Sequence, residues 1–320
     1  MVKEKVKILF VGLNYHNYTK SIISELEAKH YNIFFHEIKP RNFLAKFLQT
    51  ISPYLFKKYL NFLHRKIFQK YKNTTFAYIF FLQVHYVSHH NMRYAKRLFK
   101  KSKFILYNWD SVSTHDYTNH IKYFDSCFTF DSDDSKKYNI NYLPLFVDPF
   151  YYSYENKAPF LNIYFVGNIV SERRYFALKK FINFCKLNQI KFKFHMKISP
   201  LIFLKLIFKG HMPYMTTFFD ISPNSYKKLL EESGTVFDVS NHIQSGYTMR
   251  LIENLYMNKK IITSSKNVKD ENFYSTDRIL IISDFEFNIS SILNFINRPL
   301  KKNTDFVNFK CDSFIENLFK

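Results

Sequence analysis

Short apolar runs alternate with amphipathic stretches from the start of the chain. Residues 6–12 form an apolar run that ends at Gly12, residues 19–29 have the apolar spacing of a helix, and residues 32–37 are again apolar. This strand–helix–strand opening is typical of doubly wound sheets, whose parallel strands are buried on both faces. Further strands of the same kind are predicted at residues 77–82, 104–107 and 125–130.

The pattern lapses at residues 148–159 and then begins again. The second series opens with another apolar run that ends at a glycine, Gly167, and a chain of 320 residues is long for one domain. We therefore predict two Rossmann-like α/β domains, at residues 1–150 and 160–304. They are expected to face an interdomain cleft, because such sheets bind ligands at the carboxyl ends of their strands. Residues 305–320 are predicted to form a C-terminal helix that packs back on the first domain.

Positive charge is concentrated in two stretches that contain no acidic residue. The chain has 47 Lys and Arg against 26 Asp and Glu, a net charge of +21. Residues 38–109 contain 15 basic residues and no acid, and residues 173–219 contain 10 and no acid. An AT-rich coding sequence would raise the overall pI but would not remove the acids from these stretches. Surfaces of one sign attract phospholipid headgroups, nucleic acid or phosphorylated substrates.

The compartment is predicted from the cysteines and from the N-terminal residues. The three Cys are far apart and form no CxxC pair, which is typical of a reducing cytosol. Residues 1–7 are charged, and the apolar run that follows is too short for a signal peptide. We expect a cytoplasmic protein that can associate with the inner face of the cytoplasmic membrane.

The first acid-free stretch contains a helical region at residues 43–72, interrupted at Pro53. Phe and Leu recur there near helical spacing. The basic residues interleaved with them are Lys57, Lys58, Arg65, Lys66 and Lys70. Helices that lie on a membrane surface have this composition, and so do core helices with a solvated basic face. On the first interpretation these five side chains would face an anionic membrane.

Most of the candidate ligand-binding residues lie in residues 244–264, whose pattern predicts a loop, a helix, a turn and a strand. Ser245 and Gly246 lie at the helix N-terminus, where backbone N–H groups and the helix dipole favour a phosphate. Arg250 and Glu253 are three residues apart and therefore share a helical face. An arginine can neutralise a diphosphate and a glutamate can accept two ribose hydroxyls, although a surface ion pair on an ordinary helix has the same spacing.

This stretch resembles the donor-sugar segment of GT-B glycosyltransferases, which have two Rossmann-like domains. It is most similar to the CgeB-like and cell-surface polysaccharide types (lipopolysaccharide or capsule), which carry R-x-x-E ahead of a strand. The resemblance implies that Glu253 holds the donor ribose and that Arg250 holds the donor phosphates. These families often have Gly before the strand, whereas this chain has Asn258, which also supports the end of a helix.

A second segment, residues 164–168 with Arg173 downstream, is similar to the opening of the donor domain in the same family. There Gly167 would let the backbone approach the diphosphate and Arg173 would neutralise it, although an ordinary strand-to-helix turn can have the same residues. The first loop, at Gly12, is expected near the ligand as well. The predicted donor-binding residues are Gly12, Gly167, Asn168, Arg173, Ser245, Gly246, Tyr247, Thr248, Arg250 and Glu253.

Candidates for the acceptor side follow the strand predicted at residues 104–107. GT-B transferases that invert need a base from the acceptor domain to deprotonate the acceptor hydroxyl. Asp110, His115 and Asp116 are the candidate catalytic residues. A capping role is the alternative for Asp110.

Asp131, Ser132 and Asp133 have the spacing of a metal-binding DxD motif, but they lie between a predicted strand and a predicted helix. Acids at such a position cap the helix, and Ser132 or Asp133 is the expected cap. His85, His89 and His90 lack a carboxylate or Cys partner for zinc. We therefore predict no metal site and no cofactor, with the nucleotide sugar as a substrate.

Together these features predict a metal-independent glycosyltransferase that moves a sugar from a nucleotide-sugar donor to a cell-surface glycan or a lipid-linked acceptor, beside an anionic membrane surface. Two alternatives differ in their partners. A basic nucleic-acid-binding protein would need a recognisable reader module, and the sequence has none, so no nucleic acid is expected. A non-catalytic membrane-associated scaffold would bind lipid and turn over no donor.

Overall fold

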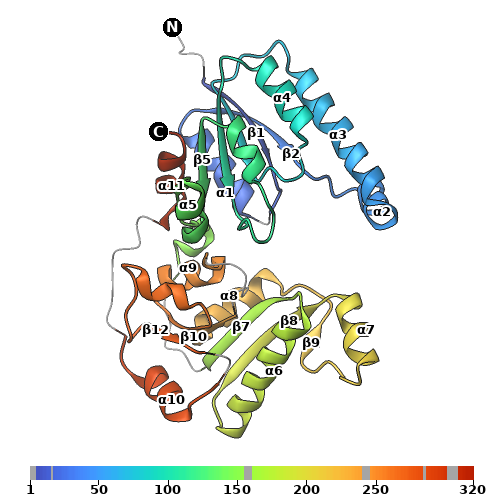
Figure 1. The fold of residues 1–320 in the computed structure, drawn as a ribbon. Coiled ribbons are helices and arrows are strands. Elements are labelled where there is room, and N and C mark those ends of the chain that lie inside the picture. Colours follow the sequence, from blue (N-terminus) through green and yellow to red (C-terminus); the bar gives the residue numbers. More distant parts are fainter. Residues whose placement is uncertain (1–4, 16, 155–160, 240–245, 284–285, 301–308) are drawn as a thin grey trace. The chain divides into compact units, whose positions relative to one another are not determined.

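The computed structural model describes residues 5–15, 17–154, 161–239, 246–283, 286–300 and 309–320. The chain divides into two compact units, with the junction between Pro149 and Phe150. Gly246 and the C-terminal segment 309–320 are grouped with the first unit. Each unit contains a parallel six-stranded sheet with helices packed on it (Figure 1).

The first sheet has the strand order β2-β1-β3-β4-β5-β6, and every neighbouring pair is parallel. Its central strands are buried on both faces, which is why the sequence there is a continuous apolar run. Gly12 pairs with Glu37 and with Leu82, so β1, β2 and β3 end at the same level. The strands are β1 (Lys7–Gly12), β2 (Asn32–Glu37), β3 (Tyr78–Leu82), β4 (Lys103–Asn108), β5 (Ser126–Thr129) and β6 (Asn141–Tyr142).

Four helices of the first unit begin at residues whose polar side chains cap them. Asn42 Oδ1 accepts a hydrogen bond from Ala45 N at 2.8 Å, and Ser52 caps the next helix, which opens with Pro53. The predicted interruption at Pro53 is therefore confirmed. The helices are α1 (Tyr18–Ala28), α2 (Phe43–Ile51), α3 (Pro53–Lys70), α4 (His89–Leu98), α5 (Ser132–Tyr138) and α11 (Cys311–Leu318), with the 3-10 turn η1 (Thr118–Tyr123). A second 3-10 turn, η2 (Pro149–Tyr151), spans the junction of the two units.

The second sheet has the order β12-β11-β10-β7-β8-β9 and is also parallel throughout. Counted from β7, this is the order 3-2-1-4-5-6 of dinucleotide-binding folds. The strands are β7 (Leu161–Ile169), β8 (Phe192–Ile198), β9 (Thr216–Thr217), β10 (Ser233–Asp238), β11 (Lys260–Thr263) and β12 (Ile279–Ile281).

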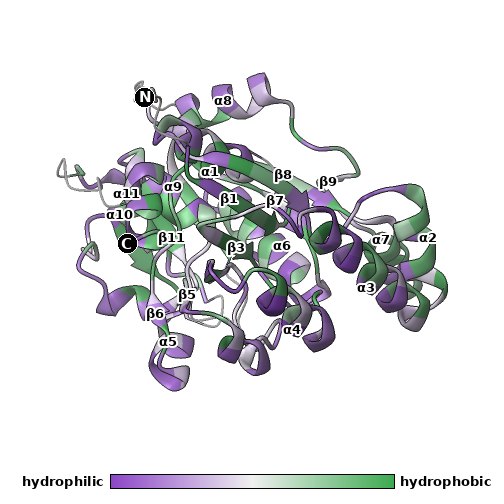
Figure 2. Ribbon diagram, turned by 90° about the horizontal axis from the view of Figure 1, so that it is seen from above, coloured by the Kyte–Doolittle hydropathy of each residue, from purple (hydrophilic) through white to green (hydrophobic). Residues whose placement is uncertain are grey.

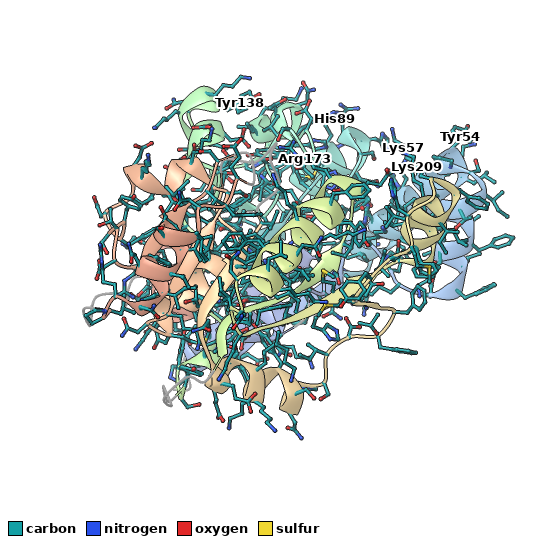
Figure 3. The ribbon with its side chains drawn as sticks, turned by 90° about the horizontal axis from the view of Figure 1, so that it is seen from below. Tyr54, Lys57, His89, Tyr138, Arg173 and Lys209 are labelled. Carbon is teal, nitrogen blue, oxygen red and sulfur yellow. The ribbon has the colours of Figure 1, made fainter. Side chains whose placement is uncertain are left out.

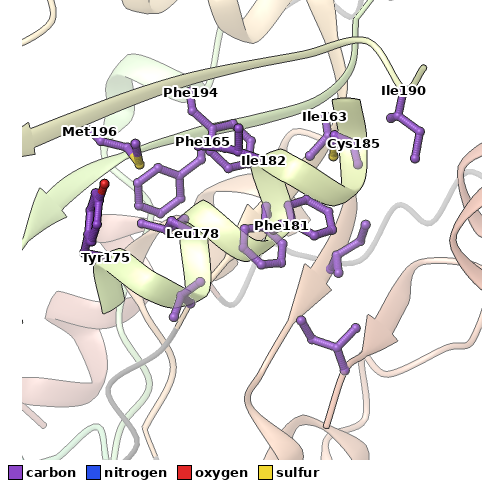
Figure 4. Close-up of a cluster of buried hydrophobic side chains, with 14 of the residues drawn as sticks. Ile163, Phe165, Tyr175, Leu178, Phe181, Ile182, Cys185, Ile190, Phe194 and Met196 are labelled. Atoms are coloured by element: carbon purple, nitrogen blue, oxygen red, sulfur yellow. The ribbon is translucent and has the colours of Figure 1, made fainter. Parts of the chain in front are cut away.

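An aromatic core holds the helix α6 against the second sheet (Figure 4). The rings of Phe181 on α6 and Phe237 on β10 stack with centroids 3.8 Å apart, and Phe165 and Phe194 lie beside them. The helices of this unit are α6 (Glu172–Leu187), α7 (Pro200–Phe208), α8 (Pro223–Glu232), α9 (Met249–Tyr256) and α10 (Ile289–Asn297), with the 3-10 turn η3 (Lys266–Asp270). Within the described residues, no helix is long and apolar enough to cross a membrane.

Two details differ from the sequence prediction. The cap of α5 is Asp131, whose Oδ1 accepts from the N–H groups of Asp133 and Asp134 at 3.1 Å, rather than Ser132 or Asp133. The helix α7 was not predicted, because its nearly unbroken apolar sequence lacks the polar face that marks a surface helix. Asn258 has the positive φ of 54° expected just past the end of a helix.

Two adjacent lysines are buried at the start of β11, where they bond to carbonyl oxygens at helix ends. Lys259 Nζ donates to Leu230 O at 2.6 Å and to Ser233 O. Lys260 Nζ donates to carbonyl groups in the last turn of α10, including Phe295 O at 2.6 Å. The two side chains therefore take up orphan carbonyl groups at the ends of α8 and α10.

Burial lowers the pKa of Lys259 to about 7, from 10.5 in an exposed lysine. Between these two values the unfolded chain holds a proton that the folded chain lacks, so folding stability rises with pH. From pH 7 to pH 9, we expect the free energy of unfolding of the native chain to rise by on the order of 2 kcal/mol more than that of Lys259→Met. Urea denaturation at both pH values measures this difference, and parallel pH profiles for the two proteins would contradict it.

Candidate functional site

The candidate site lies at the carboxyl end of the second sheet, between β7 and β10. The chain leaves β7 toward β8 on one side, whereas β10 leads to β11 on the other, so this is the topological switch point of the sheet. Ligands of open α/β sheets bind at such a point. Gly167 lies near the end of β7, and Asp238 is the last residue of β10.

Arg250, in the first turn of α9, bridges the two strands. Its Nη1 forms an ion pair with Asp238 Oδ1 at 2.9 Å, and its Nη2 donates to Val166 O at 2.5 Å. The guanidinium carbon also lies 4.9 Å from the centre of the Phe165 ring. Burial lowers the pKa of Arg250, but Asp238, Tyr226 and Tyr164 together raise it by more, so the pKa is raised overall.

Asp238 is fully buried and organises the N-terminus of α9. Its Oδ1 also accepts a hydrogen bond from Thr248 Oγ1 at 2.8 Å, and its Oδ2 accepts one from Thr263 Oγ1 at 3.3 Å. Thr248 is the N-cap of α9, and its Oγ1 accepts from Leu251 N at 3.1 Å. One buried carboxylate thus fixes both the start of α9 and the arginine that α9 carries.

A second arginine, Arg174 in the first turn of α6, lies on the other side of Gly167. Its guanidinium carbon is 5.7 Å from the centre of the Phe165 ring, and its buried Nε has no hydrogen-bond partner among the described residues. Burial and the nearby charge of Arg250 lower the pKa of Arg174 to about 10, although Asp238 opposes both effects. The guanidinium group of Arg174 therefore stays charged at neutral pH, and its Nε has no hydrogen-bond partner among the described residues.

Gly167 lies next to both arginines and leaves space for the guanidinium group of Arg250. A Cβ placed on Gly167 would lie 2.6 Å from Arg250 Nη2 and 3.5 Å from Arg174 Nη2. Any other residue would therefore displace a guanidinium group. Two arginines beside an accessible glycine backbone are a suitable environment for a phosphate or diphosphate anion.

The arginine that lies beside Gly167 is not the one predicted from the sequence. Arg173 is exposed at the start of α6 (labelled in Figure 3), and the arginine beside Gly167 is Arg174. The reason is the cap: Ser171 Oγ accepts from Arg174 N at 3.3 Å, which starts α6 at Glu172 and fixes the direction of each side chain. Asn168 is exposed and pairs with Lys197 of β8.

The remaining predicted donor-binding residues are distributed around the start of α9. Ser245 lies outside the described residues, and Gly246 is grouped with the first unit, where its N–H donates to Asp131 Oδ2 at 3.2 Å. Tyr247 is buried, and its hydroxyl donates to the carboxylate of Glu271.

Glu253 lies one turn beyond Arg250 on α9 and is 7% exposed. Its charge acts on Tyr226, whose pKa is raised first by burial and then by Glu253. The next residue, Asn254, is held at both ends: it accepts from Tyr164 at 2.7 Å and donates to Arg250 O at 2.8 Å. The helix turn that carries Arg250 and Glu253 is therefore fixed on its buried side.

In the first unit, polar side chains gather where β3 and β4 end. Asp110 Oδ2 accepts a hydrogen bond from Gln83 Nε2 and lies 3.9 Å from His115 Nε2. The ring of His115 stacks on His85, with centroids 3.9 Å apart. Asp110 and His115, two of the three predicted catalytic residues, are therefore neighbours. Asp116 instead accepts two hydrogen bonds from Thr118, which lower its pKa and hold a local turn.

Two further residues in this cluster were not predicted as site residues. Gln83 is buried and has a φ of 67°, a backbone conformation that is rare for a side chain of this size. Burial lowers the pKa of His85 to about 3, so this ring is neutral at physiological pH. Among the described residues, Gln83 Oε1, His85 Nε2 and Asn108 Nδ2 are buried without a hydrogen-bond partner. Such groups cost free energy unless a bound molecule or water satisfies them.

Gly12, at the end of β1, has a packing role that the sequence alone did not reveal. A Cβ there would lie 2.7 Å from the Phe10 ring and 2.9 Å from Leu82 Cβ. No group of three or more His, Cys, Asp or Glu side chains within the described residues is arranged to hold a metal ion.

The predicted membrane-facing residues lie on α3. Lys57, Lys58, Lys66 and Lys70 are exposed, and Lys57 is labelled with Tyr54 in Figure 3. Arg65 is exposed as well, and it also contacts α4: its Nη1 is 2.9 Å from His90 Nε2, and its guanidinium carbon lies 4.1 Å from the centre of the Tyr94 ring.

No protein-family model matches the sequence, and no curated protein sequence matches it. Solved structures, in contrast, match nearly the whole chain. A glycosyltransferase from Rickettsia africae ESF-5 is 14% identical with a TM-score of 0.59, covering 99% of this chain and 95% of that one. An alpha-glucosyltransferase in complex with UDP and a DNA 13-mer is 10% identical with a TM-score of 0.59, covering 98% and 95%.

The catalytic domain of starch synthase IV from Arabidopsis thaliana, bound to ADP and acarbose, is 8% identical with a TM-score of 0.60, covering 99% and 96% of the two chains. Identities this low carry information about the fold alone. Together with the two six-stranded parallel sheets, they show that the chain has the two-domain α/β fold of GT-B glycosyltransferases.

The two neighbouring arginines of α6 provide a matched pair of variants for anion binding. We expect Arg174→Ala to weaken the binding of inorganic pyrophosphate roughly tenfold, because a charged hydrogen-bonding partner is lost. Arg173→Ala should bind pyrophosphate as the native chain does, because its side chain points to solvent. Isothermal titration calorimetry on the three proteins measures both effects. A larger loss of pyrophosphate affinity in Arg173→Ala than in Arg174→Ala would instead support Arg173 as the diphosphate-binding arginine, as predicted from the sequence.

Proposed function

We propose that this chain is a glycosyltransferase that takes a sugar from a nucleotide-sugar donor. The observation that carries the proposal is the pair of arginines at the β7–β10 switch point, Arg250 bridging the strands and Arg174 beside Gly167. The starch synthase with the same fold is bound to ADP, and the alpha-glucosyltransferase is bound to UDP. A nucleoside diphosphate supplies the two negative charges that such a pair would bind.

In the proposed reaction, the bond between the sugar carbon and the diphosphate oxygen breaks, and the nucleoside diphosphate leaves with the electron pair. Negative charge then grows on the leaving oxygen, next to Arg174 and Arg250. Because Asp238 holds Arg250 in place beforehand, no reorganisation is needed at that moment, and charge stabilisation of this kind is among the strongest effects in catalysis. We propose that these side chains neutralise the diphosphate without a metal ion.

Glu253 is proposed to hold the donor ribose. A carboxylate can accept hydrogen bonds from two adjacent hydroxyl groups. Its position one turn from Arg250 on the same face of α9 suits a ligand that places ribose and diphosphate next to each other.

The acceptor hydroxyl must lose its proton as its oxygen bonds to the sugar carbon. We propose Asp110 as the base, because Gln83 orients one of its oxygens and His115 lies beside it. The strained backbone of Gln83 supports this assignment, since such conformations are concentrated at functional positions. The unpartnered polar atoms of Gln83, His85 and Asn108 are proposed to bind hydroxyl groups of a glycan or lipid-linked acceptor.

The surface of α2 and α3 is proposed to contact an anionic membrane. Large apolar side chains project into solvent there: Phe43, Phe47, Ile51, Tyr54 and Phe62, with Phe43 82% exposed. Lys57, Lys58 and Lys66 are exposed on the same pair of helices. A mixed apolar and basic helix surface is typical of proteins that lie on anionic lipid. Such a contact would hold the enzyme at the cytoplasmic side of the membrane, within reach of a lipid-linked acceptor of a cell-surface polysaccharide.

The donor is identified by a thermal-shift screen against nucleoside diphosphates and nucleotide sugars. We expect one nucleoside diphosphate to raise the melting temperature, because a ligand that binds only the folded chain stabilises it. The shift should be lost in Glu253→Ala and kept in Glu286→Ala, which removes an exposed glutamate of the same unit. An unchanged shift in Glu253→Ala would refute the ribose assignment. Binding to DNA or RNA without any nucleotide shift would favour the nucleic-acid hypothesis.

Membrane contact through α3 is tested by removing four of its charges. We expect Lys57→Ala, Lys58→Ala, Lys66→Ala and Lys70→Ala in one chain to lower binding to phosphatidylglycerol vesicles at least about tenfold, since each lysine near such a surface contributes about 1 kcal/mol. The control removes Lys100, Lys101, Lys136 and Lys137, which are exposed elsewhere in the same unit. Vesicle sedimentation measures both variants. Equal losses of binding would mean that only the net charge of the protein matters, and would contradict a membrane contact through α3.

A further inference from the structure

The second unit has its own exposed apolar surface, formed by α7 and the segment that follows it as far as the residues just after β9. We call this the α7 surface and define it by Leu201, Leu204, Phe208, Met212, Phe218 and Phe219. Leu201 is 77% exposed and Phe208 is 86% exposed. The ribbon of α7 is mostly hydrophobic in colour in Figure 2, which fits its sequence of eight apolar residues and one lysine.

The outward direction of these side chains follows from the way α7 packs. Leu206 is buried, and Ile202 and Phe203 contact the core of the second unit. Leu201, Leu204 and Phe208 are three and four residues apart, so they share the opposite, solvent-facing side of the helix. A helix that is apolar on both sides needs a second apolar environment outside the unit.

The charge around the α7 surface indicates what that environment is. No acidic residue occurs from Arg173 to Phe219, whereas that stretch contains 10 basic residues. Lys205 and Lys209 share a single carboxylate, Glu172, at 2.9 and 2.8 Å, and both remain more than half exposed. Lys209 is labelled at the end of α7 in Figure 3. The apolar side chains are therefore flanked by an excess of positive charge.

A second copy of this chain is a poor occupant for such a surface. The net charge of the chain is +21, so two copies would bring like charges together at a surface that already has a positive excess. An anionic bilayer meets both requirements, because its headgroups attract the lysines and its acyl chains accept the Leu and Phe side chains.

We propose that the α7 surface inserts into the headgroup and outer acyl region of an anionic membrane. The second unit then has a membrane contact of its own, in addition to the one proposed for α2 and α3 in the first unit. This inference rests on exposure and charge within the second unit and does not depend on the glycosyltransferase proposal. Failure of the donor screen would leave it intact.

Insertion is tested with a single tryptophan placed at the most exposed position. Trp109 is the only native tryptophan and lies in the first unit, so its emission can be subtracted. We expect the emission of Phe208→Trp to shift to shorter wavelength on phosphatidylglycerol vesicles and to be quenched by brominated acyl chains. Leu187→Trp is the matched control, since Leu187 is 84% exposed at the end of α6, and its emission should not change.

Affinity is tested with polar replacements of the same positions. Leu204→Ser combined with Phe208→Ser should lower partition into these vesicles at least about tenfold, whereas Val170→Ser combined with Leu187→Ser should leave it unchanged. Circular dichroism checks that each variant is folded. The proposal is wrong if Phe208→Trp shows no shift on vesicles, or if both pairs lose affinity equally. It is also wrong if sedimentation velocity shows a native dimer that Leu204→Ser and Phe208→Ser abolish, because the occupant would then be a second copy.

Discussion

The buried ion pair between Asp238 and Arg250 is the interaction on which the candidate site depends. A carboxylate with no exposed surface is stable only when it is fully paired, and Asp238 is paired with the arginine and with two threonine hydroxyl groups. Those partners come from α9 and β11, and the arginine also bonds to β7. One carboxylate therefore ties together the strands on both sides of the switch point and the helix that closes it.

This arrangement explains how a cationic site can exist before a ligand arrives. Arg250 is compensated by Asp238, so it can be buried and fixed, whereas Arg174 is only partly compensated and keeps an unsatisfied nitrogen. The first arginine supplies rigidity and the second supplies attraction for an anion. Gly167 fits this arrangement because the guanidinium group of Arg250 occupies the space where any other side chain would begin.

Local sequence patterns predicted most of the strands, the two-sheet fold and the helix that carries Arg250 and Glu253, because these follow from apolar runs and helical spacing. The partners of Arg250 could not be predicted, since Asp238 and Val166 are brought to it only by the sheet order. The sequence did contain one indication of such a partner, because Asp238 is an acidic residue at the end of a predicted buried strand. Arg173 was preferred over Arg174 because the direction of each side chain depends on where Ser171 starts the helix. The backbone strain at Gln83 and the solvent-facing side of α7 have no local sequence signal.

The C-terminal segment gives the chain an unusual order of assembly. Phe314 packs 4.8 Å from both Tyr107 and Phe146, measured between ring centroids, and Val147 N donates to Phe309 O at 2.7 Å. These contacts belong to the first unit, yet α11 is synthesised after the whole of the second. On the ribosome, the second unit can complete its core before the first one does, and a nascent chain must keep the surface of Tyr107 and Phe146 uncovered until translation reaches α11.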